Sequence, residues 1–316
     1  MKKGKAGIMY DTVNFWIDGS AAGVEPFAVL PYLTDQEERK SQRLGYSCSG
    51  KLGAYSVYCS ERGITLWGSL AAFHLLSNAY TLTRATTAEA LEAMSDQLHV
   101  DMMAAKVTRL DISTIIPTTR PPSDYFSVLG MKTRYTRLLT HPDTLYYNQK
   151  FRQLVFYDKS KEARAKGAVL PPALVGCNLL RYEARWKRPQ TALKQYAPVT
   201  GETLTDPVFY YNIIQEWKRE FDTIKKINPI SMKEMDTSTR PKAKNALFAK
   251  LLQQAGQSCI DDFIKELKAK NEFSDRKEYS RLKSDLNQLL QAPSAGSSEL
   301  MEELSRAVDE VAKYAR

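Results

Sequence analysis

The chain has 316 residues, of which 43% are hydrophobic and 26% are charged. This is an ordinary composition for a globular protein, and the length allows two domains or one large one. Forty-five Lys and Arg residues against thirty-six Asp and Glu residues give a formal net charge of +9. Such an excess attracts polyanions, with nucleic acid as the natural candidate, although charge alone also fits a merely basic soluble protein.

The cysteines and the hydropathy exclude two further classes. The four cysteines are widely spaced, with no CxxC pair, so we expect reduced or buried thiols rather than a zinc site. No run of about 18 apolar residues is present, and the basic start Met1-Lys-Lys-Gly-Lys lacks the apolar stretch of a signal peptide. The sequence therefore predicts a cytoplasmic protein without a membrane partner.

In chain order, residues 10–17 alternate and are rich in β-formers, which predicts a first strand. The glycine-rich stretch 46–70 suits a twisted hairpin or meander with bulges. Helical spacing follows over 71–78 and 87–103, and residues 106–116 form the next predicted strand.

Prolines end that strand at Pro117, and a short helix is expected over 124–129. A basic, aromatic loop or hairpin then reaches Gln149. The aromatic residues from Tyr125 to Tyr147, interleaved with Lys132, Arg134 and Arg137, are candidates for stacking with single-stranded nucleic acid and for binding its phosphates. Strands are predicted over 153–159 and 179–187, with a polar helix between them.

Strand patterns disappear after about residue 200, where the apolar spacing becomes helical. The fold class expected is α+β, with an antiparallel or mixed sheet and flanking helices followed by a mostly helical C-terminal domain. We predict an α+β domain over 8–195, a helical DNA- or partner-binding domain over 205–291, and a linker with a terminal amphipathic helix over 292–316. That last helix could dock on the body or on another subunit.

Three strand-like segments carry the chemistry: 107–113, 153–159 and 180–187. Side chains alternate faces along a strand, so those at every second position share one face. The residues grouped in this way are Arg109 with Asp111, Tyr157 with Lys159, and Arg181 with Glu183, Arg185 and Lys187. If the strands adjoin, two carboxylates, a tyrosine and several cations converge, as metal-assisted chemistry on a phosphodiester with a tyrosine nucleophile would require.

Each residue type has a role in such chemistry. A phenol with a pKa near ~10 is a poor nucleophile at neutral pH, so Tyr157 needs a cationic neighbour, for which Lys159 is suitably placed. Carboxylates bind Mg²⁺ or Mn²⁺, and the predicted ligands are Asp111, Glu183 and, as a third contributor, Asp11. Guanidinium and ammonium groups bind phosphate oxygens, and the predicted phosphate-binding residues are Arg109, Arg181, Arg185 and Lys187.

Simpler interpretations stay open for each residue. The carboxylates could only pair with the arginines across a solvated sheet face, and Tyr157 could be an aromatic at the edge of the core. Tyr146 and Tyr147 are rival nucleophiles on a predicted loop. Lys159 could form no more than a local salt bridge with Glu162.

The motifs Arg109-Leu-Asp111-Ile-Ser, Leu154-Val-Phe-Tyr157-Asp-Lys159 and Leu180-Arg-Tyr-Glu183-Ala-Arg-Trp-Lys187 stand in this order and at this spacing. Together they resemble the gene II/X family of phage and plasmid rolling-circle replication initiators, over roughly residues 8–195. The resemblance implies a site-specific nicking endonuclease and strand transferase, distantly similar to the HUH class. In that chemistry a tyrosine attacks a DNA phosphate, which leaves a free 3′-hydroxyl and a 5′-phosphotyrosine link.

On this resemblance the nucleophile maps onto Tyr157 and the acidic positions onto Asp111 and Glu183. The chain departs from the HUH pattern because its three histidines, His74, His99 and His141, include no His-x-His pair. Carboxylates must then supply the ligands, which favours Mg²⁺ or Mn²⁺ as the divalent cation.

The partners implied are single-stranded or supercoiled origin DNA, a host helicase and polymerase, and a second copy of the chain, in the cytoplasm of a bacterial host. The alternatives are a non-catalytic DNA-binding replication or copy-control protein, and a conjugative relaxase with the same chemistry.

Overall fold

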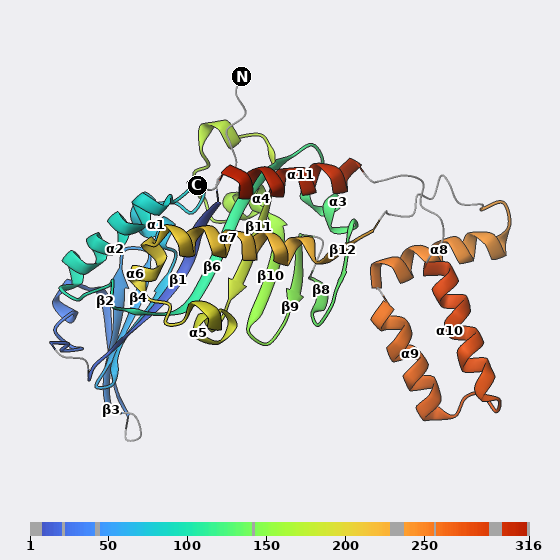
Figure 1. The fold of residues 1–316 in the computed structure, drawn as a ribbon, viewed down its shortest axis with the longest axis horizontal. Helices are drawn as coiled ribbons and strands as arrows, with labels where there is room; N and C mark the ends of the chain where they lie inside the picture. The colour runs from blue at the N-terminus through green and yellow to red at the C-terminus, as the bar shows by residue number, and fades with distance from the viewer. Residues whose placement is uncertain are drawn as a thin grey trace.

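The computed structural model describes residues 8–20, 23–41, 45–140, 143–227, 237–255, 257–290 and 299–314. The fold is α+β, as predicted: a large sheet flanked by helices, several of them in the C-terminal region (Figure 1). Ten of the described strands form one sheet, in the order β2-β3-β4-β5-β1-β6-β11-β10-β9-β8, and their pairings are antiparallel. The strands β7 and β12 pair separately.

The strand bounds are β1 (Ile8–Asp18), β2 (Thr34–Ser41), β3 (Gly45–Leu52), β4 (Tyr55–Ser60), β5 (Gly63–Gly68), β6 (Lys106–Thr118), β7 (Leu129–Lys132), β8 (Thr136–Thr140), β9 (Thr144–Asn148), β10 (Arg152–Asp158), β11 (Asn178–Trp186) and β12 (Ile224–Lys226). The α-helix bounds are α1 (Leu70–Leu75), α2 (Arg84–Leu98), α3 (Pro122–Phe126), α4 (Lys159–Ala165), α5 (Pro189–Ala192), α6 (Gly201–Thr205), α7 (Pro207–Asp222), α8 (Arg240–Ala255), α9 (Gln257–Lys270), α10 (Arg276–Leu290) and α11 (Glu299–Tyr314).

The sheet has one apolar face, which follows from the alternation along its strands. Leu110 and Ile112 of β6 and Tyr182 and Trp186 of β11 are buried in the main core. Helix α7 covers this face, and its ribbon crosses in front of the strands in Figure 1. The residues between these apolar ones point to the opposite face, which carries the predicted polar side chains.

Two helices predicted to lie outside the α+β domain belong to its core. Helix α7 begins where Asp206 accepts hydrogen bonds from the amides of Val208 and Phe209, and it buries Trp217 and Phe221 against the sheet. Helix α11 buries its apolar stripe in the same core, so it docks on the body. The core therefore extends past the predicted boundary at residue 195.

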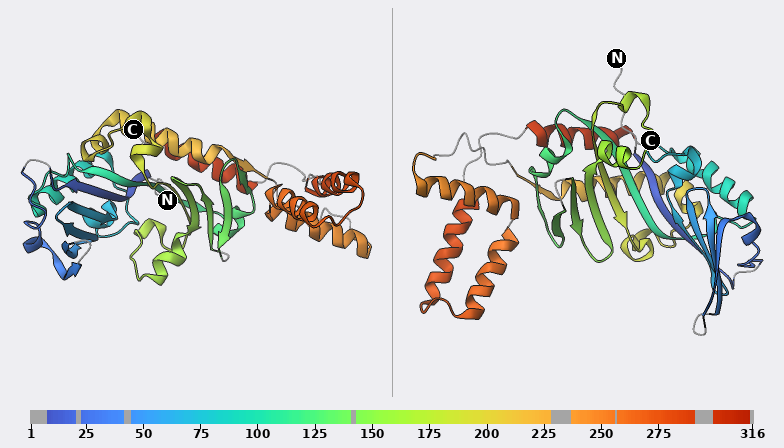
Figure 2. Two further views of the ribbon diagram at one scale, coloured as in Figure 1. Left: turned by 90° about the horizontal axis from the view of Figure 1, so that it is seen from below. Right: turned by 180° about the vertical axis from the view of Figure 1, so that it is seen from behind.

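Helices α8, α9 and α10 form a separate cluster around Ile260, Ile264 and Tyr279. They lie apart from the sheet in the views of Figure 2. This unit corresponds to the greater part of the predicted helical domain, and the chain enters and leaves it between α7 and α11. It is an insertion into the core sequence rather than a terminal extension.

Two strands differ from prediction. All eight residues of the edge strand β2 are exposed, and its charged sequence lacks the apolar alternation by which a strand is recognised. Strand β6 continues beyond Ile116 through Pro117, because its pairing with β11 extends to Thr118 opposite Asn178.

Among the helices that the structure describes, none combines the length and apolarity that a bilayer span requires.

Candidate active site

The predicted site residues of β6, β10 and β11 lie side by side because these strands are neighbours. Arg185 lies opposite Asp111, and Tyr157 lies opposite Arg181. The cross-strand pairs place the polar side chains on the face opposite α7, as the alternation predicts. The convergence of two carboxylates, a tyrosine and several arginines is therefore present in the structure.

Glu183 is the centre of this arrangement. The Tyr157 hydroxyl donates to its Oε1 at 2.8 Å, and Arg181 Nε donates to the same oxygen at 2.8 Å. Arg185 donates to Oε2 from Nη2 at 2.6 Å and from Nε at 2.9 Å. The carboxylate is buried, so its charge is balanced by two guanidinium groups rather than by water.

Asp111 forms a second buried carboxylate beside the first. Arg109 binds it with both Nε and Nη2, at 3.0 and 2.6 Å, and Arg185 Nε lies 3.7 Å from Oδ2. Arg185 thus bridges Asp111 and Glu183. The side chains of Arg109 and Arg185 are 34% and 23% exposed, so both cations can reach a ligand that approaches from solvent.

Arg181 does not fit the predicted phosphate-binding role in this arrangement. Its side chain is fully buried, and its Nη2 donates to Asp11 at 2.6 Å and to Ser113 Oγ at 2.8 Å. Its Nη1 donates to the carbonyl oxygen of Asn78 at 2.8 Å. A guanidinium with every nitrogen engaged and no exposed surface holds other groups in place, here the carboxylates of Asp11 and Glu183.

Lys159 is also placed differently from the prediction. Strand β10 ends at Asp158, which caps α4, and Lys159 is the first residue of that helix. Its buried ammonium donates to Asn78 Oδ1 at 2.8 Å and to Glu162 Oε2 at 2.6 Å. Burial lowers the pKa of Lys159, and the local salt bridge with Glu162 that the sequence left open is present.

Lys187 lies just past the end of β11 and is exposed. The alternation that was expected to continue through this residue stops at Trp186, the last residue of the strand. Lys187 is therefore at the margin of the polar face, where it can meet a distant phosphate.

The electrostatics set the two carboxylates apart. Burial raises the pKa of Asp111 to about 6, against the opposing effect of Arg109. Burial also disfavours the charge on Glu183, but Arg181 and Arg185 outweigh it and lower the pKa of Glu183 to about 2. Burial raises the pKa of Tyr157 well above its ordinary value, so the phenol is neutral and donates to an ionised Glu183. Carboxylates with separated pKa values are suited to different roles in proton transfer.

The predicted metal ligands are not grouped around one point. Asp11 accepts from Ser69 Oγ at 2.8 Å and from Arg181, so each of its oxygens is occupied. Within the described ranges, no group of three His, Cys, Asp or Glu side chains is arranged to hold a metal ion. Because arginines occupy all three carboxylates, this arrangement does not fit a directly bound Mg²⁺ or Mn²⁺.

The rival tyrosines lie on opposite faces of β9. Tyr147 is fully buried in the core, and its hydroxyl donates to the carbonyl oxygens of Leu129 and Gly130 at 3.0 and 2.7 Å. Tyr146 lies opposite Val155, on the face that carries Tyr157. Tyr125, at the start of the segment predicted to stack with nucleic acid, is also fully buried, so neither Tyr125 nor Tyr147 is available for stacking.

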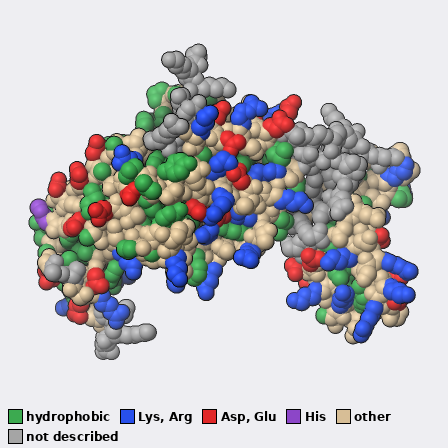
Figure 3. All heavy atoms as spheres, in the orientation of Figure 1, with side chains coloured by type: hydrophobic (Ala, Val, Ile, Leu, Met, Phe, Trp, Pro, Cys, Tyr) green, Lys and Arg blue, Asp and Glu red, His purple; other side chains and the backbone are tan. Residues whose placement is uncertain are grey.

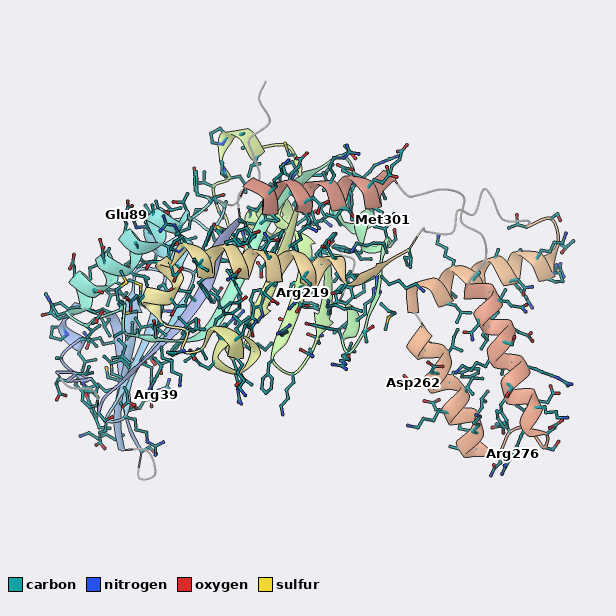
Figure 4. The ribbon with its side chains drawn as sticks, in the orientation of Figure 1. Arg39, Glu89, Arg219, Asp262, Arg276 and Met301 are labelled. Atoms are coloured by element: carbon teal, nitrogen blue, oxygen red, sulfur yellow. The ribbon has the colours of Figure 1, made fainter. Side chains whose placement is uncertain are left out.

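The histidines lie away from the site where they are described. His74 Nε2 lies 3.5 Å from Glu89, whose position is labelled in Figure 4, and the His99 ring packs against Tyr32. His141 lies outside the described residues.

A second buried cluster was not predicted from the sequence. Glu220 of α7 accepts from the Tyr135 hydroxyl at 2.9 Å and from Arg152 Nη1 at 2.6 Å, and Lys132 Nζ lies 3.0 Å from Glu220 Oε2. The cluster borders a cavity of about 480 Å³ that is also lined by Arg134 and Arg219, and Arg219 is labelled on α7 in Figure 4. Its members come from separate elements, so no strand alternation groups them.

The family model for the N-terminal region of the gene II replication-associated protein matches residues 9–202, more than half of the chain. The chain belongs to this family. It is a phage replication-associated protein related to the gene II rolling-circle initiators, as the ordered motifs predict. No curated protein matches the chain. The matched region of this gene II family member includes Asp11, Asp111, Tyr157 and Glu183, and a replication initiator implies DNA as a partner.

Proposed function

We propose that this protein is a site-specific DNA-nicking endonuclease and strand transferase that starts rolling-circle replication by forming a 5′-phosphotyrosine link. The observation that supports it most is the 2.8 Å hydrogen bond from Tyr157 to Glu183, beside the partly exposed guanidinium groups of Arg109 and Arg185. The family of replication initiators supports the same function. A nucleophile with an adjacent acceptor, oriented by further groups, is the general form of covalent catalysis.

The reaction is a transesterification. The Tyr157 oxygen attacks the scissile phosphorus, the bond from phosphorus to the 3′-oxygen breaks, and the phenolic proton moves to Glu183. The leaving 3′-oxygen takes a proton, for which Asp111 is the neighbouring buried acid, because its pKa near 6 leaves a protonated fraction close to neutral pH. In the reverse step a DNA 3′-hydroxyl attacks the phosphotyrosine and releases the enzyme.

The partly exposed arginines provide electrostatic stabilisation in this proposal. As phosphate oxygens approach, Arg109 and Arg185 can share their N–H donors between the carboxylates and the phosphate. That sharing also weakens the hold of Arg185 on Glu183, which makes the carboxylate a stronger proton acceptor at the moment it is needed. Arg181 keeps the Glu183 side chain in position meanwhile.

Metal dependence stays a prediction, and no step of the proposed reaction passes through a metal. Divalent cations commonly assist displacement at phosphorus by neutralising charge. The test is to repeat the nicking reaction with EDTA and with added Mg²⁺ or Mn²⁺. Loss of nicking with EDTA and its recovery with one of these ions would establish the requirement; nicking that is indifferent to EDTA would refute it.

The central experiment incubates the purified protein with a supercoiled plasmid that carries the DNA flanking its own gene. Denaturing gels then measure open circles and a covalent protein–DNA adduct. Wild type should give both, and Tyr157→Phe should give neither. The matched control is Tyr135→Phe, which removes a hydroxyl that donates to a buried glutamate in the second cluster and should leave both products intact.

Other outcomes point elsewhere. Salt-sensitive DNA binding without nicks or adduct would favour a non-catalytic DNA-binding replication protein. An adduct that survives Tyr157→Phe would move the nucleophile, first to Tyr146 on the same face. An adduct lost in Tyr135→Phe but not in Tyr157→Phe would move the chemistry to the Glu220 cluster.

A further inference from the structure

The polar face continues beyond the candidate active site onto β1, β5 and β4, where it carries three aromatic side chains. These are Trp16, Tyr58 and Trp67, which we call the aromatic platform. Trp67 is 41% exposed, and the other two are half-buried. Their chain neighbours, such as Leu66 and Val57, point into the core. The platform residues therefore face away from the core, by the same alternation that places the candidate active-site residues on the polar face.

The strand register places the three residues at neighbouring positions on β1, β5 and β4. Thr65 of β5 lies opposite Trp16 on one side and Tyr58 on the other, and Trp67 is two residues along β5 from Thr65. Trp67 is thus the diagonal neighbour of both other residues, at a separation of about 7–8 Å between backbone positions. The Trp16 ring extends along β5 toward Gly63, away from Trp67, so the three side chains spread over the face. Three rings on adjacent strands give a surface broad enough for more than one stacked base.

The platform is continuous with the candidate active site through Asn14. Since Phe15 lies opposite Leu66, the preceding Asn14 lies beside Trp67, and on its other side Asn14 lies opposite Arg109. Arg109 holds Asp111 of the site. One row of side chains therefore leads from the exposed tryptophan to the arginine beside the proposed reaction centre.

The side chain of Asn14 lies on this row of polar positions. Its Oδ1 is a buried atom that finds no hydrogen-bond partner among the described residues. Because this atom is buried, a nucleobase can reach it only after the Asn14 side chain moves, so Asn14 marks a position between Trp67 and Arg109 rather than a ready ligand site.

Lysines border the platform at two points. Lys106 lies opposite Trp16, and Lys51 on β3 donates to Ser56 beside Trp67. Acidic residues also lie near Trp16: Asp18, two positions along β1, accepts from Ser20 twice, and Asp101 lines one cavity together with Trp16, Asp18 and Lys106. Lysines at the margin of a stacking surface are the usual arrangement for single-stranded nucleic acid.

We infer that the aromatic platform binds single-stranded DNA next to the nick, with unpaired bases stacked on Trp67, Trp16 and Tyr58 and the backbone leading over Asn14 to Arg109. Double-stranded DNA does not fit, because paired bases present no free ring faces. A protein partner is a less suitable occupant, since serine, threonine, asparagine and lysine side chains surround the rings. The position of the nick in this inference rests on the proposed function, whereas the binding surface does not depend on it.

The test measures binding of full-length protein to a fluorescently labelled single-stranded oligonucleotide from the DNA flanking its gene, by anisotropy. Loss of one stacked base costs about 1–3 kcal/mol, so Trp67→Ala should raise Kd about 5- to 150-fold. Trp67→Phe should recover most of the affinity. The matched control is Tyr211→Ala, which removes a 54% exposed ring from α7 and should leave Kd unchanged. Thermal unfolding confirms that each variant is folded.

The outcomes separate this inference from the proposed function. Unchanged single-strand affinity in both Trp67→Ala and Trp16→Ala would overturn the platform, even if the Tyr157 adduct forms. Equal losses for single- and double-stranded DNA would overturn base stacking and leave general charge attraction. A selective loss for single strands, in a protein that forms no adduct, would keep the platform and reject the nicking function.

Discussion

The molecule contains two buried glutamates with the same kinds of neighbour. Glu183 on β11 has Arg181, Arg185 and the hydroxyl of Tyr157, and Glu220 on α7 has Lys132, Arg152 and the hydroxyl of Tyr135. Both glutamates have a lowered pKa, because their cations outweigh the effect of burial. A tyrosine bound to a buried, ionised glutamate is therefore not by itself evidence of catalysis.

What differs is the surroundings. Beside Glu183 lies a second buried carboxylate, Asp111, with a raised pKa, whereas the exposed fractions of the nearest arginines are similar in the two clusters, 23% for Arg185 and 25% for Arg152. Beside Glu220, Lys132 donates to the carbonyl oxygen of Glu220 itself and Arg152 donates to the carbonyl oxygen of Ala192. The first contact ties α7 to β7, and the second ties β10 to α5. The comparison separates a cluster arranged to meet a phosphate from one that fastens a helix.

Neutralising each glutamate in turn tests whether the two clusters differ in function. Loss of a general base costs about 10²–10⁴-fold in rate, so Glu183→Gln should reduce adduct formation by that factor. Glu220→Gln should leave the rate unchanged once folding is confirmed. Single-turnover adduct formation measures both, and equal losses would erase the functional difference between the clusters.

Removing one arginine from each cluster tests their energetics. Arg181 is fully buried and its loss leaves Asp11 and Glu183 without a shared partner, so Arg181→Ala should lower the free energy of unfolding by about 3–5 kcal/mol. Arg152 is 25% exposed and Glu220 keeps Lys132 and Tyr135, so Arg152→Ala should cost about 1–3 kcal/mol. Denaturant unfolding gives both values. A smaller loss of unfolding free energy in Arg181→Ala than in Arg152→Ala would contradict the role of Arg181 as the central positioning residue.

The two clusters should respond to pH with opposite sign. The folded-state pKa of Asp111 is raised from 3.8 to about 6, so its contribution is present below pH 4 and is lost as pH rises to about 6, by about 3 kcal/mol. The folded-state pKa of Glu220 is lowered, so its contribution is present above its ordinary value of 4.5 and is lost as pH falls. Unfolding of wild type, Asp111→Asn and Glu220→Gln between pH 3 and 7 gives each difference. If the unfolding free energies of Asp111→Asn and Glu220→Gln differed from wild type in the same way across this pH range, the opposite pKa shifts of Asp111 and Glu220 would be refuted.

The smallest expected effect is on the tyrosine hydroxyls. Each donates one hydrogen bond to a buried carboxylate, so Tyr157→Phe and Tyr135→Phe should each lower the free energy of unfolding by about 1 kcal/mol. Equal stability losses would show that the two hydroxyls are matched structurally. Any difference in nicking would then come from chemistry rather than from unfolding.

The sequence predicted one cluster and not the other for a physical reason. Strand alternation fixes which side chains share a face, so Arg109 with Asp111, and Arg181 with Glu183, could be grouped from spacing alone. The Glu220 cluster joins residues 132, 135, 152 and 220 through tertiary packing, which has no period in the sequence. Strand alternation also does not show how deeply a side chain is buried. It could therefore not distinguish Arg181, which is buried with every nitrogen hydrogen-bonded, from the partly exposed Arg185.

The ends of strands and domains were predicted less well than the sheet face on which each side chain lies. Lys159 was grouped with Tyr157 because the strand was extended by one residue, whereas Asp158 caps a helix at that point. Helix α7 was grouped with the later helices by its spacing, although its buried face of Trp217 and Phe221 completes the core of the sheet. An amphipathic pattern shows that a helix has a buried side but does not identify what covers it.

The docking of α11 has a consequence for how the protein is made. Leu304, Val308 and Val311 of this helix enter the same core as β6 and α7, and Glu303 accepts hydrogen bonds from Thr119. Figure 4 labels the helix at Met301, and in Figure 3 the surface of this region carries Lys, Arg, Asp and Glu side chains. A nascent chain that already carries Tyr157 and Glu183 still lacks part of the core until residues 299–314 have left the ribosome. The core of the sheet is therefore completed only after the inserted helices α8, α9 and α10 and then residues 299–314 have been synthesised.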